Sequence, residues 1–296
     1  MATDAVGVDL RLGIDQPTGH WPTVPRLKSY EAAGFAHVQV RMPPRHLLTD
    51  PEMVAVHAGA LNEVLELTGL HLILHAPDDL LAGDPEHDAQ FEGAIEYAAR
   101  AGCDLVVYHA ARVPLKLGAD AVSARLAAER TSLRRLIKRA AKLGVRVACE
   151  NLAPVYPGRE FACHDPQVIG ALVRALDNPA AGICLDLGHA HIVSELRKSE
   201  ISEFIKPVLE QVILFHVHDN FGASLSRDRS GGREPLRLDL HLAPGAGSVP
   251  WSKLAPLLAR HQAPVQLEVH PPARPEVATL AIVVRELMTP RTAAAI

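Results

Sequence analysis

The sequence of 296 residues predicts an α/β fold, a (β/α)8 barrel formed by a single domain over residues 1–296. Eight short apolar runs alternate with eight helical segments, which is the pattern of a parallel sheet covered by helices. Many of the apolar runs also end in ionisable residues, which a barrel gathers at one rim. An open doubly wound sheet is the alternative, but it concentrates its ligands at one switch point rather than at so many strand ends.

The first half of the chain shows this alternation through its apolar runs and its helix boundaries. Pro51 and the pair Asp84-Pro85 are typical of helix starts, because proline fixes φ and lacks a donor that the first turn would leave unpaired. Gly34 and Gly102 suit helix ends because glycine has no Cβ. The expected order is strand 6–12, helix 22–34, strand 37–42, helix 51–69, strand 70–76, helix 84–102, strand 104–111 and helix 120–144.

The second half continues the alternation and is interrupted by one long irregular segment. Val212 to Phe215 are four consecutive apolar residues, which indicates a strand buried on both faces. Segment 221–248 has no clear periodicity, and loops of that length are usually functional or disordered. The expected order is strand 145–151, a helix from Asp165-Pro166, strand 181–187, helix 201–211, strand 212–220, the long loop, helix 249–261, strand 264–269 and helix 275–288.

Composition and charge leave the class of partner open. A net charge of −4 and a pI near 6.5 give no global attraction to nucleic acid, although a local basic face is compatible with them. No apolar run approaches the roughly 20 residues that cross a bilayer, and the N-terminus does not resemble a signal peptide. We therefore expect a cytoplasmic protein without a membrane partner. The four cysteines form no C-x-x-C pair and are expected to be reduced. The sequence does not indicate the oligomeric state.

Five histidines and four carboxylates lie at the expected strand ends or in the long loop. Gathered at one rim, they would repel one another or stay unpaired unless cations neutralised them, which favours divalent metal ions. Imidazole and carboxylate ligands suit zinc, manganese or related ions. The nine candidate ligands are His75, His109, Glu150, Asp186, His189, His216, Asp239, His241 and Glu268.

The motifs around these residues resemble those of the xylose isomerase-like TIM barrels, a superfamily that includes endonuclease IV, sugar epimerases and inosose dehydratases. In chain order they are LHAPDDL (74–80), VVYHA (106–110), CENLA (149–153), CLDLGHA (184–190), FHVHDN (215–220), DLHLAPGAG (239–247) and LEVH (267–270). The resemblance implies a shared metal quartet of Glu150, Asp186, His216 and Glu268. It also implies a second site of His75, His109 and a bridging Glu150, and a third site, as in endonuclease IV, of His189, Asp239 and His241. One to three ions per chain are expected, most simply Zn²⁺, with Mn²⁺ as the alternative.

Some assignments within this resemblance stay open. His216 and His218 share one face of their strand, and His216 is favoured because the family's H-x-x-D pattern then ends at Asp219. His218, His189 and Asn151 are candidate contacts to substrate. Family members often carry an acidic residue where this chain has Ala246, which leaves the surroundings of the third site open.

The resemblance admits two functions that use the same site. The preferred one is a divalent-metal-dependent isomerase or epimerase, or a related lyase, acting on a sugar, sugar phosphate or polyol-derived carbonyl compound. In such enzymes a metal ion acidifies a C–H bond between two bound oxygens, and Glu150 and Glu268 would move the proton. The expected partner is then a small carbohydrate-like molecule. Segment 221–248 would form a loop over the site, tethered to metal by Asp239 and His241.

The alternative is an endonuclease IV-like trinuclear-zinc enzyme that cleaves DNA at apurinic or apyrimidinic sites. All nine ligands of that site have counterparts here, and DNA would then be the partner. DNA enzymes also need phosphate contacts and a wedge that opens the duplex. The stretch 41–48 could supply a wedge, and Arg227, Arg229, Arg233 and Arg237 lie along the long loop. The acidic stretch 78–88 opposes this function.

Overall fold

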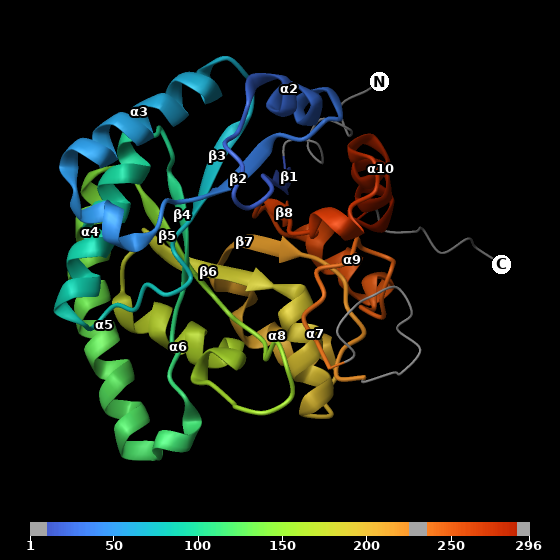
Figure 1. Cartoon of the computed structure of the whole chain (residues 1–296). Coiled ribbons are helices and arrows are strands. Elements are labelled where there is room, and N and C mark those ends of the chain that lie inside the picture. Colours follow the sequence, from blue (N-terminus) through green and yellow to red (C-terminus); the bar gives the residue numbers. More distant parts are fainter. Residues whose placement is uncertain (1–10, 225–235, 289–296) are drawn as a thin grey trace.

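Eight parallel strands form a closed barrel surrounded by helices in the computed structural model (Figure 1). The structure describes residues 11–224 and 236–288. Each strand pairs with the next along the chain, and the last pairs with the first, so that Leu12 lies opposite Val265. This confirms the predicted (β/α)8 fold. The strands are β1 (Leu12–Asp15), β2 (His37–Arg41), β3 (His71–His75), β4 (Leu105–His109), β5 (Arg146–Glu150), β6 (Ala181–Asp186), β7 (Val212–Val217) and β8 (Val265–Leu267).

Three helices of the outer layer begin with a capping aspartate followed by proline. The side chains of Asp50, Asp84 and Asp165 accept hydrogen bonds from backbone N–H groups of the first turns that follow them, which would otherwise lack partners. The helices are α2 (Val24–Ala32), α3 (Pro51–Glu66), α4 (Pro85–Arg100), α5 (Ala119–Lys142), α6 (Pro166–Leu176), α7 (Leu187–Leu196), α8 (Ile201–Ile205), α9 (Trp251–Arg260) and α10 (Val277–Met288). None of the described helices is long and apolar enough to cross a membrane.

Three elements differ from the sequence-based prediction. Most of the expected strand 6–12 lies outside the described residues, and the first described strand is β1. The expected helix 201–211 divides into α8 and a 3₁₀ helix, Lys206–Gln211, which contains Pro207, a residue without a backbone donor. Helix α7 is absent from the prediction. Eight of its ten residues are buried, so it lacks the polar face by which an amphipathic helix is recognised.

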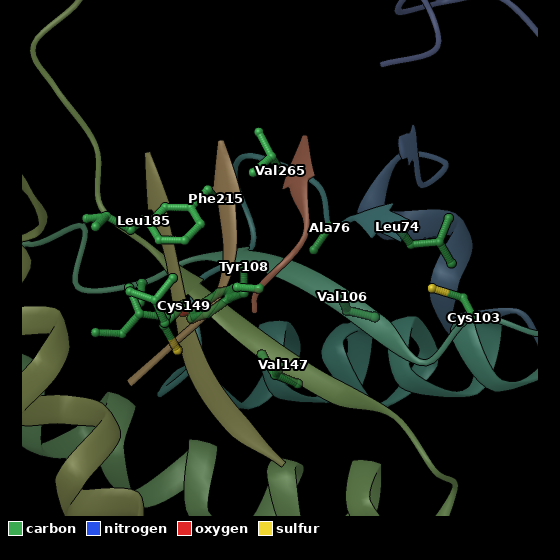
Figure 2. Close-up of a cluster of buried hydrophobic side chains, with 14 of the residues drawn as sticks. Leu74, Ala76, Cys103, Val106, Tyr108, Val147, Cys149, Leu185, Phe215 and Val265 are labelled. Carbon is green, nitrogen blue, oxygen red and sulfur yellow. The ribbon is translucent and has the colours of Figure 1, made fainter. Parts of the chain in front are cut away.

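The core has one layer outside the barrel and a smaller one within it. Outward-facing strand residues such as Val106, Tyr108 and Phe215 pack beneath the helices (Figure 2). A separate cluster consists of Ile73, Leu105, Val107, Ala148, Cys184 and Leu214. Because side chains alternate along a strand, these residues share a face with the polar residues at the strand ends, which therefore lie above an apolar inner layer. All four cysteines are buried and free.

Candidate metal centre

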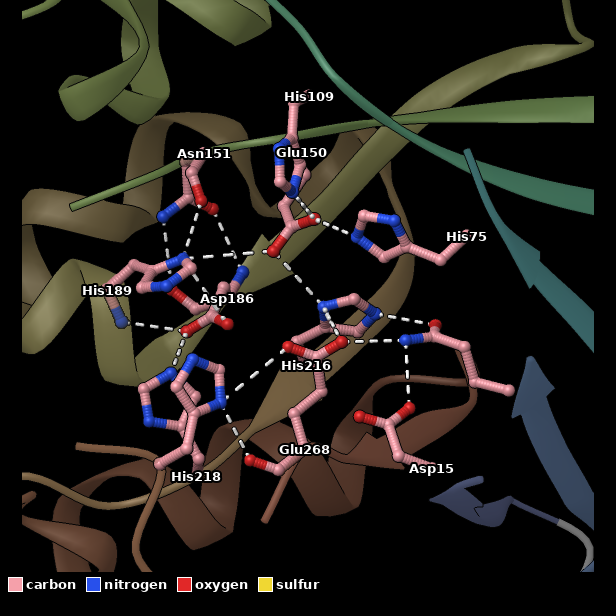
Figure 3. Close-up of polar contacts among 12 residues, drawn as sticks. Asp15, His75, His109, Glu150, Asn151, Asp186, His189, His216, His218 and Glu268 are labelled. Carbon is pink, nitrogen blue, oxygen red and sulfur yellow. Dashed lines mark hydrogen bonds and ion pairs between the residues drawn. The ribbon is translucent and has the colours of Figure 1, made fainter. Parts of the chain in front are cut away.

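The carboxyl ends of the strands and the segment after β7 bring all nine candidate ligands together, and Figure 3 labels all of them except Asp239 and His241. Seven of them line a cavity of about 660 Å³. Asp186 and His216 are completely buried and lie outside the residues that line this cavity. The other seven line it directly: His75, His109, Glu150, His189, Asp239, His241 and Glu268.

Glu150, at the end of β5, contacts two groups of ligand-type side chains. Its Oε2 atom lies 3.4 Å from Nε2 of His75 and 3.3 Å from Nε2 of His109. Its Oε1 atom lies 3.2 Å from Nδ1 of His216. The Nδ1 atom of His75 lies 2.7 Å from the carbonyl oxygen of Ala76, which orients the ring and turns Nε2 toward the carboxylate. The geometry thus allows Glu150 to serve both groups.

The second group consists of Glu150, Asp186, His216 and Glu268, whose possible ligand atoms all lie within 4.8 Å of one another. The Nδ1 atom of His216 lies 3.2 Å from an oxygen of Glu150 and 3.2 Å from Oε1 of Glu268. The other ring nitrogen, Nε2, donates to Oε1 of Gln39 at 2.9 Å. Since Nε2 carries the hydrogen, Nδ1 is the nitrogen left for a metal ion.

Two residues beside this group, Gln39 and Asp15, are absent from the sequence-based prediction. Gln39 on β2 donates to Oε1 of Glu268 at 2.6 Å and to Oδ1 of Asp15 at 2.9 Å. Burial and the charge of Glu268 raise the pKa of Asp15 to about 7. The period-two alternation along β2 places Gln39 on the same face as His37 and Arg41. Gln39 could have been found from this alternation, but a search for ionisable residues at strand ends passes over an uncharged amide in the middle of a strand.

The third group lies on the other side of Asp186. The Oδ2 atom of Asp239 lies 3.6 Å from Nε2 of His189 and 3.1 Å from Nε2 of His241. The Nδ1 atoms face carbonyl oxygens, that of His189 toward Asn151 at 3.0 Å and that of His241 toward Glu268 at 2.8 Å. His218, directly after β7, lies within the same 4.8 Å limit. His241 adopts a φ of 47°, a left-handed backbone conformation that costs about 1–3 kcal/mol for a residue other than glycine.

The charges of the centre depend on one another. Burial disfavours the ionised form of Glu150, but the charge of His216 and the nearby imidazoles of His109 and His75 outweigh it and hold the pKa of Glu150 well below its ordinary value. Burial also disfavours the protonated form of His241, whereas Asp239 raises the pKa of His241 to about 9. The buried carboxylates therefore stay ionised only when a positive charge lies beside them. Either a protonated imidazole or a divalent cation can supply that charge.

Several buried polar atoms of the centre have no hydrogen-bond partner among the described residues. They are Oε2 of Glu150, Oδ2 of Asp186, Oδ1 of Asp239 and both ring nitrogens of His218. Buried polar groups are almost always paired in folded proteins, so atoms left over at one place indicate a ligand. Imidazole nitrogen and carboxylate oxygen are the donors that zinc and manganese accept, and the residues present fit such ions.

The wall of the cavity adds charged and apolar side chains. Arg41 at the end of β2 is paired with Asp78, and Oδ1 of Asp78 lies 3.8 Å from Nδ1 of both His75 and His109. Val155 and Tyr156 contribute apolar surface. A ligand in the cavity would thus meet a floor of carboxylates and imidazoles and a wall of mixed character.

The candidate substrate contacts lie at different depths. His189 lines the cavity, whereas Asn151 and His218 are completely buried and are not among the lining residues. The side-chain amide of Asn151 is used within the fold: it donates to the carbonyl oxygen of Asp186 at 3.1 Å and accepts from the N–H of Asp186 at 2.9 Å. These positions leave His189 as the one of the three that faces the cavity.

Only some of the residues considered above for DNA contacts lie in the described part of the chain. Arg227, Arg229 and Arg233 lie outside the described residues. Residues 45–49 form a 3₁₀ helix, in which Leu48 is buried, as is Met42 before it. Arg45 is paired with Asp79 at 2.8 Å and with Glu86 at 3.1 Å. Met42 and Leu48 are therefore unavailable as a wedge, whereas Leu47 is half-buried and Pro44 is exposed.

The long loop is fastened at its far end by Asp219, the last residue of the H-x-x-D pattern. Its Oδ1 atom accepts from the N–H of Val249 at 3.1 Å, and its Oδ2 atom accepts from the N–H of Gly245 at 2.8 Å and from Nε1 of Trp251 at 3.0 Å. The backbones of Asp219 and Leu242 also pair as an antiparallel bridge. Asp219 thus holds residues 242–251 next to the metal centre without being one of its ligands.

Comparison with known proteins shows a family and a set of similar structures. The family model described as xylose isomerase-like TIM barrel matches residues 27–285. No curated protein matches the chain significantly. Among solved structures, a D-tagatose 3-epimerase-like protein is 19% identical with a TM-score of 0.69, covering 94% of this chain and 97% of its own.

Two further structures show the same likeness. The 3-keto-D-glucoside 4-epimerase YcjR from E. coli is 16% identical with a TM-score of 0.68, and the match covers 94% of this chain and 98% of YcjR. The IOLI protein with a bound zinc atom has the same identity, TM-score and coverage. At these identities the likeness establishes the shared fold alone.

Proposed function

The chain belongs to the xylose isomerase-like TIM barrel family, and on this basis we propose that it is a divalent-metal-dependent isomerase or epimerase, or a related lyase. Its substrate would be a sugar, sugar phosphate or polyol-derived carbonyl compound. The observation that supports this most directly is that Glu150 and Glu268 both line the cavity and both lie 3.2 Å from Nδ1 of His216. Two carboxylates beside the same histidine can both bind a metal ion and still accept or donate a proton on a substrate bound next to that ion.

A bound divalent ion would polarise a substrate carbonyl oxygen and the adjacent hydroxyl oxygen, and so acidify the C–H of the hydroxyl-bearing carbon next to the carbonyl. The protein would move the proton. Of the two carboxylates, Glu150 has both oxygens directed at histidines. Oε1 of Glu268 is held by Gln39, whereas its Oε2 lies 3.9 Å from Nδ1 of His241, too far for a hydrogen bond. Glu268 is therefore the better candidate for the group that removes a proton from carbon. Glu150 is the better candidate for the carboxylate on the opposite face of that carbon.

The cavity has the size and chemistry for such a substrate. Its volume of about 660 Å³ lies within the roughly 300–1,000 Å³ of small-molecule sites. Asp78 offers a hydrogen-bonding group to hydroxyls, and Val155 and Tyr156 offer an apolar surface to C–H groups. A sugar-sized polyol presents both kinds of surface.

A second candidate function is phosphodiester cleavage of the endonuclease IV type. It is favoured by one specific observation, namely that each of the nine ligand-type side chains belongs to a group whose possible ligand atoms lie within 4.8 Å of one another. Against it stand the buried apolar residues of stretch 41–48 and the pairing of Arg41 and Arg45 with carboxylates, which weakens them as phosphate contacts.

The test is to incubate metal-loaded protein in D₂O with a panel of ketoses, inososes and sugar phosphates and, separately, with an abasic-site duplex at controlled salt. Exchange of a substrate C–H for deuterium, seen by NMR, reports proton transfer even when no net product accumulates. Wild type should show exchange with at least one sugar-like compound, and Glu268→Gln should not. Duplex cleavage in proportion to bound metal, without exchange on any sugar, would replace the proposal by the second candidate.

A further inference from the structure

His218 occupies a position in the third group that the resemblance to known families does not explain. It is completely buried, and its Nε2 atom lies 3.8 Å from Oδ1 of Asp239 and 3.1 Å from Oδ1 of Asp186. Its ring is stacked on that of His241, with ring centroids 3.9 Å apart and an interplanar angle of 17°. The side chain is thus packed into the group rather than beside it.

Hydrogen bonding does not account for this position. Neither ring nitrogen of His218 has a hydrogen-bond partner among the described residues, although Asp186 lies close to one of them. Oδ1 of Asp239, which faces the same nitrogen, has no partner within the described part of the chain either. A buried ring nitrogen and a buried carboxylate oxygen that are directed at one place, and that have no hydrogen-bond partner among the described residues, are the arrangement that a cation completes.

We propose that His218 is the fourth protein ligand of the third metal site, together with His189, Asp239 and His241. The possible ligand atoms of these four residues all lie within 4.8 Å of one another. Zinc–ligand bonds of about 2.0–2.1 Å in a tetrahedron place neighbouring ligand atoms about 3.3 Å apart. The distances from Oδ2 of Asp239 to Nε2 of His241 and of His189, 3.1 and 3.6 Å, lie near that value. Nε2 of His218 lies 3.8 Å from Oδ1, the other oxygen of the same carboxylate.

Packing holds the ring of His218 beside the other three proposed metal ligands. A Cβ atom at Gly188 would lie 2.2 Å from Cε1 of His218, so the glycine leaves the space that the ring occupies. His189 and His241 have their Nδ1 atoms on carbonyl oxygens and present Nε2 to the group, which is how metal-binding histidines are commonly oriented. Three rings are therefore held with one nitrogen each toward Asp239.

Four protein ligands make this a closed site, and closed tetrahedral zinc sites are structural rather than catalytic. The group of His75, His109 and Glu150 supplies only three ligands and lines the cavity, which is typical of a site that keeps a position open. The third ion would instead join α7, the end of β7 and the segment 239–241. This inference rests on the geometry of the group and not on the reaction proposed above.

The first experiment is crystallographic and uses the wild-type protein. Crystals of the protein loaded with Zn²⁺ are measured at the zinc absorption edge. We expect an ion with Nε2 of His218 at about 2.1 Å. An ion bound by His189, Asp239 and His241 with His218 outside the coordination shell would overturn the proposal, and so would the lack of an ion at this group.

The second experiment measures metal retention in His218→Asn, with His270→Asn as matched control. His270 stacks on His241 with ring centroids 4.6 Å apart but is exposed and is not part of the group. After dialysis against graded chelator, His218→Asn should bind one ion on the order of 10–100-fold more weakly or worse, whereas the control should match wild type. Circular dichroism of the metal-free proteins checks folding. Equal retention by all three proteins would contradict the proposal.

Discussion

Gln39 on β2 donates a 2.6 Å hydrogen bond to the carboxylate of Glu268 after β8. The same amide accepts from Nε2 of His216 at 2.9 Å, so one uncharged side chain orients two members of the quartet. Nearest neighbours of metal ligands commonly tune affinity about 10–100-fold. Gln39 is thus a positioning residue, and we expect its replacement to lower metal affinity by disordering the two ligands that it orients.

Replacing Gln39 by Met should weaken metal binding at the quartet about 10–100-fold and lower kcat/KM by a similar factor. The physical reason is that His216 and Glu268 lose their common partner. Metal titration by calorimetry and steady-state kinetics on a substrate identified as above measure both effects. Gln90→Met is the control, because Gln90 is also buried and hydrogen-bonded but contacts Arg45 and Glu86 instead. Equal metal affinity in wild type and Gln39→Met would contradict the positioning role.

Glu268→Gln should leave the fold nearly intact and reduce kcat by about 10²–10⁴-fold, because the substitution keeps the shape of the side chain but removes the charge required by a metal ligand and by a general base. Thermal unfolding and metal content are measured with the kinetics, and exposed Glu86→Gln serves as control. An active enzyme with unchanged metal content would show that Glu268 has only a structural role.

The double substitution Asp239→Ala with His241→Ala separates the two candidate functions. If the reaction is proton transfer on a sugar-like compound, the quartet is retained, so KM should rise while appreciable kcat remains. If the protein cleaves phosphodiesters with three ions, the same change should abolish kcat. The assay gives both proteins the sugar panel and the abasic duplex, with metal content measured in parallel.

Removing metal should loosen the described part of the long loop unevenly. Residues 236–241 contain the two ligand-type side chains, Asp239 and His241, whereas residues 242–251 are also held by hydrogen bonds to Asp219. Hydrogen exchange should therefore accelerate at 236–241 on addition of chelator and change less at 242–251. Equal protection of both parts with and without metal would show that the loop is not tethered by metal.

Acid should destabilise the fold through His37, whose pKa is lowered to about 4 by burial and by the nearby His71. The unfolded chain binds a proton near pH 6.5 and the folded protein only near pH 4. The contribution to stability is therefore complete above about pH 6.5 and is lost as the pH falls toward about 4, by at most about 3 kcal/mol. His37→Gln should show a smaller loss of unfolding free energy between about pH 7.5 and 5, measured by urea denaturation. A loss equal to that of wild type would exclude His37 as the cause.

The sequence predicted the barrel and the assembly of the nine ligand-type residues because both depend on local patterns. Strand ends such as Glu150 and Asp186 are visible as the point where an apolar run meets a charged residue. Asp15 escapes the prediction because the apolar pattern places the first strand at 6–12, ahead of its described position. The alternation that groups His216 with His218 gives the face of a strand but not the depth of a side chain, so the burial of His218 and Asn151 required the structure.

The carboxylate of Glu150 belongs both to the group of His75 and His109 and to the quartet with Asp186, His216 and Glu268. An ion bound by His75 and His109 would fix this carboxylate in place for the ion of the quartet, and each would alter the affinity of the other by the same factor. The two positive ions would also repel each other. Binding of the first ion therefore strengthens binding of the second only if fixing the Glu150 carboxylate stabilises the pair by more than this repulsion costs. Occupancy of the two positions should therefore not follow two independent binding curves, and the intermediate with one ion would have its own population and its own reactivity.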